Sequence, residues 1–221
     1  MQSGPERPIP AARLDFVEAL VADLRAVTPA PALRRVLLTW IGFSVLATGA
    51  VTLLLGPLRD DVLTDLATPR LALEIGLGFA TLIALAVAGL EAGVPGGPRR
   101  TLLVLPPALF AIGWLAIALG AFSLAGPDPS SIGKREHCFL EGLLLILAPA
   151  VLGLRSIRVR SLGAGWLSGG LIGLAAGGLP ALAMQLACMY DPEHALHFHF
   201  TPMLVAAALS AFGGALLERQ T

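Results

Sequence analysis

The chain has 221 residues, of which 56% are hydrophobic and only 14% are charged. Soluble domains are typically about 45–50% apolar and about 25% charged, so this chain has too little polar surface to cover itself as a water-soluble globule. The same apolar composition argues against a disordered chain and against a nucleic-acid binder with a basic field. The 15 basic and 15 acidic residues balance, which adds little, because in a membrane protein the placement of the charges matters more than their sum. Two cysteines are too few for a disulfide-dense secreted scaffold or a four-thiolate zinc site.

The N-terminal segment begins with a Pro-rich stretch and continues into a predicted amphipathic helix over residues 12–27. Its apolar side chains recur at three- and four-residue spacing, and the prolines at positions 29 and 31 end it. Such a helix lies on the inner leaflet of a membrane or docks into a groove of a partner protein, and both uses need the same apolar face. The residues of that face are Leu14, Val17, Leu20, Val21 and Leu24.

Charges and helix-breaking residues then divide the chain into six apolar segments of 17 to 28 residues. A bilayer core needs roughly 17–25 apolar residues per helix, so each segment predicts a transmembrane helix. The segments are Val36–Gly56, Leu71–Leu90, Leu102–Ala125, Cys138–Leu154, Leu162–Met189 and Ala195–Leu217. We therefore expect an all-α, polytopic membrane protein with three parts: a cytoplasmic N-terminal arm (residues 1–34), a six-helix domain (35–217) and a short cytoplasmic tail (218–221).

The distribution of Lys and Arg predicts the orientation of this bundle. Eleven of these residues lie in the N-terminal arm, the second and fourth connections and the tail, against four in the first and third connections and none in the fifth. Both termini are therefore expected in the cytoplasm of a bacterial cell, with the protein in the inner membrane.

Small and acidic residues stand out inside the predicted spans. Four glycines in the fifth span recur at every fourth position, which lets another helix backbone approach closely and favours packing within the bundle. They are Gly165, Gly169, Gly173 and Gly177. Glu74 and Glu141 lie about one turn inside the outer ends of the second and fourth spans, from which their carboxylates are expected to snorkel to the interface.

All cysteines and histidines gather at the predicted outer ends of the last three spans, and none occurs on the cytoplasmic side. These candidate ligands are His137, Cys138, Cys188, His194, His197 and His199. Three interpretations stay open: packing and interfacial residues, a disulfide in an oxidising compartment, or a thiol and imidazole site for a soft metal or an oxidant. In a regular helix His194 and His197 share a face, whereas His199 points elsewhere.

Three stretches together resemble one known family. They are the leader LDFVEALVADLRAVTPAPALRR, the fourth span REHCFLEGLLLILAPAVLGLR and the Gly-rich fifth span with its extension, GAGWLSGGLIGLAAGGLPALAMQLACMYDPEHALHFHFTP. Over nearly its whole length the chain resembles the NrsF-type membrane anti-sigma factors of proteobacteria. The resemblance implies that the arm and cytoplasmic face hold an extracytoplasmic-function sigma factor inactive, and that Cys138 and Cys188 sense metal or oxidant stress. The stretch after Cys188 is richer in histidine than the family pattern.

The leading functional hypothesis is therefore a signalling protein and not an enzyme. Its partners are the lipid bilayer and a sigma factor on the cytoplasmic face, without direct binding to nucleic acid. No resident cofactor is expected, and a transiently bound soft metal ion is the candidate ligand. A small transporter for a metal or solute is the alternative, followed by a membrane scaffold, although the scarcity of charge near the membrane midplane disfavours transport.

Overall fold

The computed structural model describes residues 18, 21, 22, 30–94, 96–120, 124, 126, 134–160 and 165–219. The chain divides into residues 1–30 and residues 31–221. In the first part Glu18, Val21 and Ala22 are helical and exposed. The other residues predicted to form the apolar face of the arm lie outside the described residues; they are Leu14, Val17, Leu20 and Leu24.

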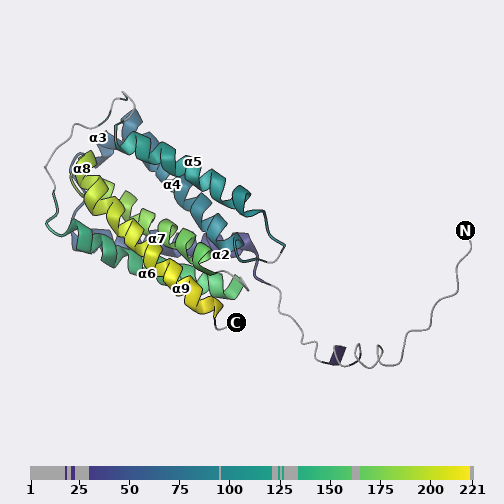
Figure 1. Cartoon of the computed structure of the whole chain (residues 1–221). Helices are drawn as coiled ribbons and strands as arrows, with labels where there is room; N and C mark the ends of the chain where they lie inside the picture. The colour runs from purple at the N-terminus through teal and green to yellow at the C-terminus, as the bar shows by residue number, and fades with distance from the viewer. Residues whose placement is uncertain are drawn as a thin grey trace, which may run out of the picture. The chain divides into compact units, whose positions relative to one another are not determined.

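The second part is a helical bundle, as predicted, and no strand occurs among its described residues (Figure 1). Its helices are α2 (Leu33–Leu55), α3 (Val62–Leu66), α4 (Pro69–Glu91), α5 (Arg100–Ala118), α6 (Cys138–Arg160), α7 (Gly165–Ala187), α8 (Pro192–His194), the π-helix η1 (Ala195–Phe200) and α9 (Thr201–Glu218). Six stretches are long and apolar enough to cross a membrane, which confirms the predicted fold class. The sixth stretch begins at Pro192, a little before the predicted start, and runs through α8, η1 and α9.

Large apolar side chains cover the outside of the bundle. Leu46 and Leu54 of α2 are 73% and 85% exposed, and Leu209 of α9 is 67% exposed. In water this surface would be a strong aggregation liability, whereas in lipid it contacts hydrocarbon at no cost. The exposed leucines therefore agree with a bundle that spans a membrane.

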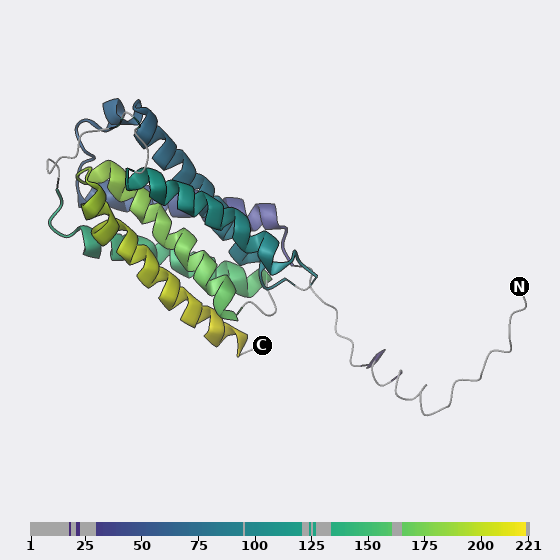
Figure 2. The same cartoon turned by 45° about the horizontal axis from the view of Figure 1, so that its top comes forward.

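Helix α7 lies inside the bundle beside α9 (Figures 1 and 2). In its most apolar stretch 78% of the residues are buried, against 22–44% in the other five spans. Small residues allow this position, because a Cβ on Gly173 would lie only 2.6 Å from the Ala206 carbonyl oxygen, and one on Gly177 only 2.6 Å from the Met203 Cα. Gly169 meets the backbone of Ser210 in the same way. Gly169, Gly173 and Gly177 of the predicted ridge thus pack against the backbone of α9, which is how helices associate closely in lipid, whereas a Cβ on Gly165 would meet the Glu218 side chain.

Polar contacts join the helices at the end of the bundle that holds Arg160, which we call the Arg160 end. The Arg160 guanidinium pairs with Glu91 and donates to the carbonyl oxygen of Pro31, so that α6, α4 and the start of α2 are joined. The Ser168 hydroxyl donates to the carbonyl oxygen of Gly89, which joins α7 to α4. The opposite end, which we call the Cys138 end, carries the cysteines and histidines.

Candidate metal and thiol site

The two cysteines lie together at the Cys138 end. Cys138 is the first residue of α6, and Cys188 directly follows α7, so the antiparallel run of these two helices brings both to one end. Their Sγ atoms are 2.8 Å apart, with either thiol able to donate, and both side chains are buried. The carbonyl oxygen of Arg135, 3.2 Å from the Cys138 Sγ, is a second acceptor for the one proton of the Cys138 thiol. In this structure both cysteines are free thiols.

The segment after Cys188 brings two histidines to the thiols. Asp191 accepts a hydrogen bond from the backbone N–H of His194 at 2.7 Å and so caps the short helix α8, whose first residue is Pro192. The π-helix η1 follows, and its wider turn relates residues five apart instead of three or four apart. His194 and His199 therefore share a face, and their ring centroids are 5.2 Å apart.

These four residues form one compact cluster. One ligand atom from each of Cys138, Cys188, His194 and His199 lies within 4.8 Å of the others, and all four side chains are buried. The Cys188 Sγ is 3.4 Å from the His194 Nε2. Two sulfurs and two imidazole nitrogens are a ligand set that suits zinc-like ions, and the same thiols can react with an oxidant.

The other two candidate histidines lie outside this cluster. His137 precedes Cys138 and is exposed, and His197 is exposed on η1. The expectation that His194 and His197 share a face while His199 points elsewhere is wrong, because it assumed a regular α-helix. A π-helix at residues 195–200 turns His199 inward.

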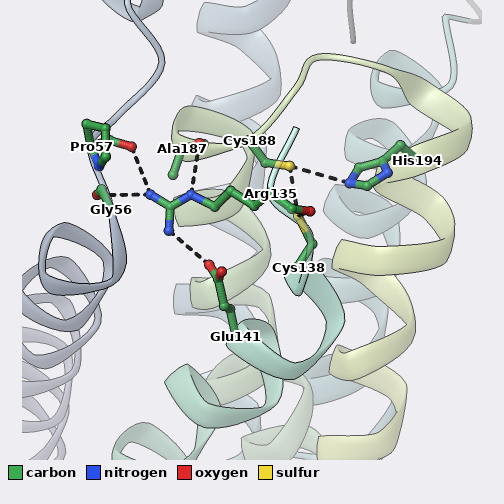
Figure 3. Close-up of polar contacts among 8 residues, drawn as sticks. All are labelled: Gly56, Pro57, Arg135, Cys138, Glu141, Ala187, Cys188 and His194. Atoms are coloured by element: carbon green, nitrogen blue, oxygen red, sulfur yellow. Dashed lines mark hydrogen bonds and ion pairs between the residues drawn. The ribbon is translucent and has the colours of Figure 1, made fainter. Parts of the chain in front are cut away.

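Arg135 holds the backbone around the cluster, as Figure 3 shows. Its guanidinium donates to the carbonyl oxygens of Gly56 (3.0 Å), Pro57 (2.8 Å) and Ala187 (3.2 Å). It also pairs with Glu141 at 2.9 Å. Ala187 directly precedes Cys188, so one side chain ties the end of α2, the first turn of α6 and the end of α7 together.

Sequence reasoning counted Arg135 only as a charge in the third connection. The signal that would have found it is its spacing, three residues before Cys138 and six before Glu141 at the start of a span. Glu141 stays at the end of the bundle as expected, but Arg135 and not solvent is its partner.

Glu74 is buried inside the bundle, and the prediction that it snorkels to the interface is wrong. Its side chain is 2% exposed, and its two carboxylate oxygens accept hydrogen bonds from Gln185 Nε2 (2.7 Å) and the Tyr190 hydroxyl (3.0 Å). The guanidinium groups of Arg59 and Arg70 each lie 5.5 Å from the centre of the Tyr190 ring. The two hydrogen-bond donors and the two nearby guanidinium groups offset the cost of burying the carboxylate. The position of Glu74 along the chain does not indicate these partners.

The environments of Cys188 and Tyr190, which lie between two spans, shift their pKa values in opposite directions. The pKa of the Cys188 thiol is lowered, chiefly because Cys138 hydrogen-bonds to its sulfur, and this outweighs the opposing effect of burial. Burial, followed by the neighbouring Glu74, raises the pKa of Tyr190, which keeps its hydroxyl protonated and able to donate. This hydrogen bond keeps its proton on Cys138, so it favours one thiolate in the pair, and the thiolate is the form that binds metals and reacts with oxidants.

The described residues thus define a polytopic helical membrane protein with a buried thiol and imidazole cluster at one end of its bundle. A family model described as negative regulator of sigma F (NrsF) matches residues 20–219, nearly the whole chain. The chain belongs to this family, whose members are regulators and negatively control a sigma factor. No curated protein and no solved structure matches the chain.

Proposed function

We propose that this protein is an anti-sigma factor that holds an extracytoplasmic-function sigma factor at the cytoplasmic face of the inner membrane. It releases this partner when Cys138 and Cys188 react on the periplasmic side with a metal ion or an oxidant. The observation that carries the proposal is the buried cluster at the Cys138 end, in a chain of the sigma-regulator family. The balance of positive charge, eleven against four, supports the assignment of the two faces.

Two chemistries are open to the thiols in this proposal. A soft metal ion can displace the thiol protons and bind both sulfurs. Alternatively, a two-electron oxidant such as a peroxide can accept two electrons while a bond forms between the two Sγ atoms and two protons leave. The present 2.8 Å separation of the sulfurs suits both, because each needs them adjacent.

Transmission to the other face needs an element that links the ends of the bundle. The cluster takes its residues from α6, from the end of α7 and from the segment that leads into α9. Helices α7 and α9 pack backbone to backbone along the glycine ridge. A displacement of the cluster residues therefore moves each helix as a rigid body, because the close-packed contact leaves no room for local rearrangement. At the Arg160 end α7 and α6 are joined to α4 by polar contacts, and Arg160 also donates to the carbonyl oxygen of Pro31, close to the end of the N-terminal arm.

The proposed docking element is the apolar face of the arm, formed by Leu14, Val17, Leu20, Val21 and Leu24. Among these Val21 is described, and it is helical and 59% exposed. Many protein partners bind an amphipathic helix by accepting its apolar face in a hydrophobic groove.

Affinity purification of the tagged full-length protein from its host membranes tests this function. The wild type should retain a sigma factor of the extracytoplasmic-function class, identified by mass spectrometry, and should release it after Cd²⁺ or a thiol oxidant is added. The double substitution Leu20→Asp with Leu24→Asp should lose the partner, because two charges oppose burial of the stripe. Asp15→Ala with Glu18→Ala, off the stripe, is the matched control and should retain it.

Absence of any sigma factor from the wild-type preparation would contradict the proposed function. Retention of the sigma factor by the double Asp variant would instead place the docking surface in the connections near Arg99 or Arg158.

A further inference from the structure

We propose that Cys138, Cys188, His194 and His199 bind one d¹⁰ divalent cation of the zinc or cadmium type in a tetrahedral site of two thiolates and two imidazoles. The inference deepens the proposed function, on which its regulatory meaning rests, by naming the ligand class that the cluster recognises. Metal binding itself is a property of the isolated protein.

The geometry of the cluster is close to that of a tetrahedral site. With bonds of about 2.3 Å to sulfur and about 2.0–2.1 Å to nitrogen, the ligand atoms of a zinc site lie roughly 3.3–3.8 Å apart. The Sγ–Nε2 distance of 3.4 Å from Cys188 to His194 lies in this range and no pair exceeds 4.8 Å, whereas the Sγ–Sγ distance of 2.8 Å is about 1 Å shorter than two thiolates on one zinc ion require. Binding of one ion would therefore move the two sulfurs apart by about 1 Å.

His199 supplies an independent indication of a ligand. Its side chain is 2% exposed, and among the described residues neither ring nitrogen makes a hydrogen bond of ordinary geometry, the Cys188 thiol being the polar group that its ring approaches. Burial of a polar group without a hydrogen-bond partner destabilises a protein, so native proteins rarely keep one without a reason. A bond to a metal ion would satisfy one of these two nitrogens, which gives a reason for burying the ring beside the thiols.

The π-helix explains how this ring reaches the thiols. A regular helix would present residue 197 or 198 beside His194, whereas the extra residue per turn in η1 presents His199. The His194 ring stacks on Phe198 at 4.7 Å between centroids, which fixes its orientation. Insertions of this kind in helices are frequent at functional sites.

The charge balance favours a divalent cation. Two thiolates and one divalent ion sum to zero, so the loaded site carries no net charge into the buried end of the bundle, whereas two thiolates without the ion would carry two negative charges. Binding sends up to two thiol protons to the solvent and changes no oxidation state. Sulfur and imidazole ligands select zinc-like ions over Mg²⁺ and Ca²⁺, which prefer oxygen.

Titration of the purified full-length protein, freed of metal with a chelator under reducing conditions, tests the site. Co²⁺ serves as the spectroscopic probe, with Zn²⁺ and Cd²⁺ as competitors. We expect one ion per chain, with the visible bands of tetrahedral Co²⁺ and a thiolate-to-cobalt charge-transfer band. His199→Ala, His194→Ala and Cys188→Ser should each weaken binding more than about 100-fold, beyond the 10–100-fold typical of an outer-shell partner.

His197→Ala is the matched control, because this residue is exposed on the same π-helix two positions from His199. It should leave affinity and spectrum unchanged. His199→Cys guards against a variant that merely unfolds: it should keep one ion per chain and add charge-transfer intensity from a third thiolate. Wild-type affinity in His199→Ala, or an equal loss in His197→Ala and His199→Ala, would overturn the site.

This test separates the inference from the proposed function. One ion bound per chain by the expected residues, without release of the sigma factor by Cd²⁺, supports the site and contradicts the metal trigger. Release of the sigma factor by an oxidant, from a protein that binds no metal, supports the proposed function and overturns the site.

Discussion

Arg135 shows how one side chain can organise the end of a membrane bundle. Helix ends leave carbonyl oxygens without partners, and the guanidinium group satisfies such oxygens at Gly56, Pro57 and Ala187 while it pairs with Glu141. The five N–H donors and planar geometry of arginine suit this role, which lysine cannot fill. The position of the Cys188 thiol therefore depends on Arg135.

Arg135→Gln should destabilise the protein by about 3–5 kcal/mol, because it removes several charge-assisted hydrogen bonds and leaves Glu141 without its partner. The measurement is thermal unfolding in detergent. Lys134→Gln, which changes the exposed neighbouring residue, should unfold like the wild type. Equal unfolding temperatures for the two variants would show that Arg135 does not hold the bundle end.

Cys138 and Cys188 should act as one unit, since their sulfurs are in contact. Each single Cys→Ser substitution should abolish most of the release of the sigma factor under metal or oxidant stress, and the double variant should be no worse. Such non-additivity is expected for residues in one interacting group. The measurement is expression of a sigma-dependent reporter. A full response in the double serine variant would reduce both cysteines to packing residues.

At the scale of elements, the contact between α7 and α9 depends on residues that have no side chain. Gly170 lies next to the ridge on the same helix, but a Cβ there would meet only the Ala211 Cβ at an ordinary 3.6 Å. At Gly173 a Cβ would instead meet backbone at 2.6–2.8 Å, and backbone cannot rotate away. The two positions therefore separate the effect of close packing from that of changing a glycine.

Gly173→Ala should destabilise the bundle by about 1–3 kcal/mol, as overpacking usually does, and should displace α9 from α7. Gly170→Ala should be neutral or stabilising by a few tenths of a kcal/mol up to about 1 kcal/mol, since alanine favours helix. Thermal unfolding compares the two, and reporter expression shows whether displacement of α9 alters control of the sigma factor. Equal effects at both positions would rule out the close contact as their cause.

At the scale of the whole molecule, the two ends of the bundle differ in chemistry. The Cys138 end carries buried thiols, imidazoles and the Glu74 network, whereas Arg160 and its partners occupy the other end. A sensor that receives a signal on one side of a membrane and acts on the other needs this separation. The proposed orientation places the Cys138 end in the periplasm.

Reporter fusions test this orientation. Alkaline phosphatase, which is active only outside the cytoplasm, should be inactive when fused after Arg100 or Arg160 and active when fused near Lys134 or Asp191. A cytoplasmic fluorescent reporter should give the reverse pattern. The opposite result at all four positions would reverse the bundle and, with it, the assignment of the thiols to the periplasm.

Hydropathy, charge and small-residue spacing were sufficient to predict the six spans, the glycine ridge and the gathering of Cys138 and Cys188 at one end. In lipid, each span must be apolar over about 20 residues and must satisfy its own backbone hydrogen bonds, so the sequence of one segment is enough to identify it as a span. The pattern can therefore be found in one segment at a time, without knowledge of its neighbours.

The chain's three-dimensional packing was needed to find the remaining features. The π-helix that places His199, and not His197, beside the thiols was not predicted, because hydrophobic periodicity assumes a regular α-helix. Glu74 turns inward because Gln185 and Tyr190, more than a hundred residues away, supply its hydrogen bonds. Buried polar groups are stabilised by partners from elsewhere in the fold, so their environment becomes visible only when those partners are in place.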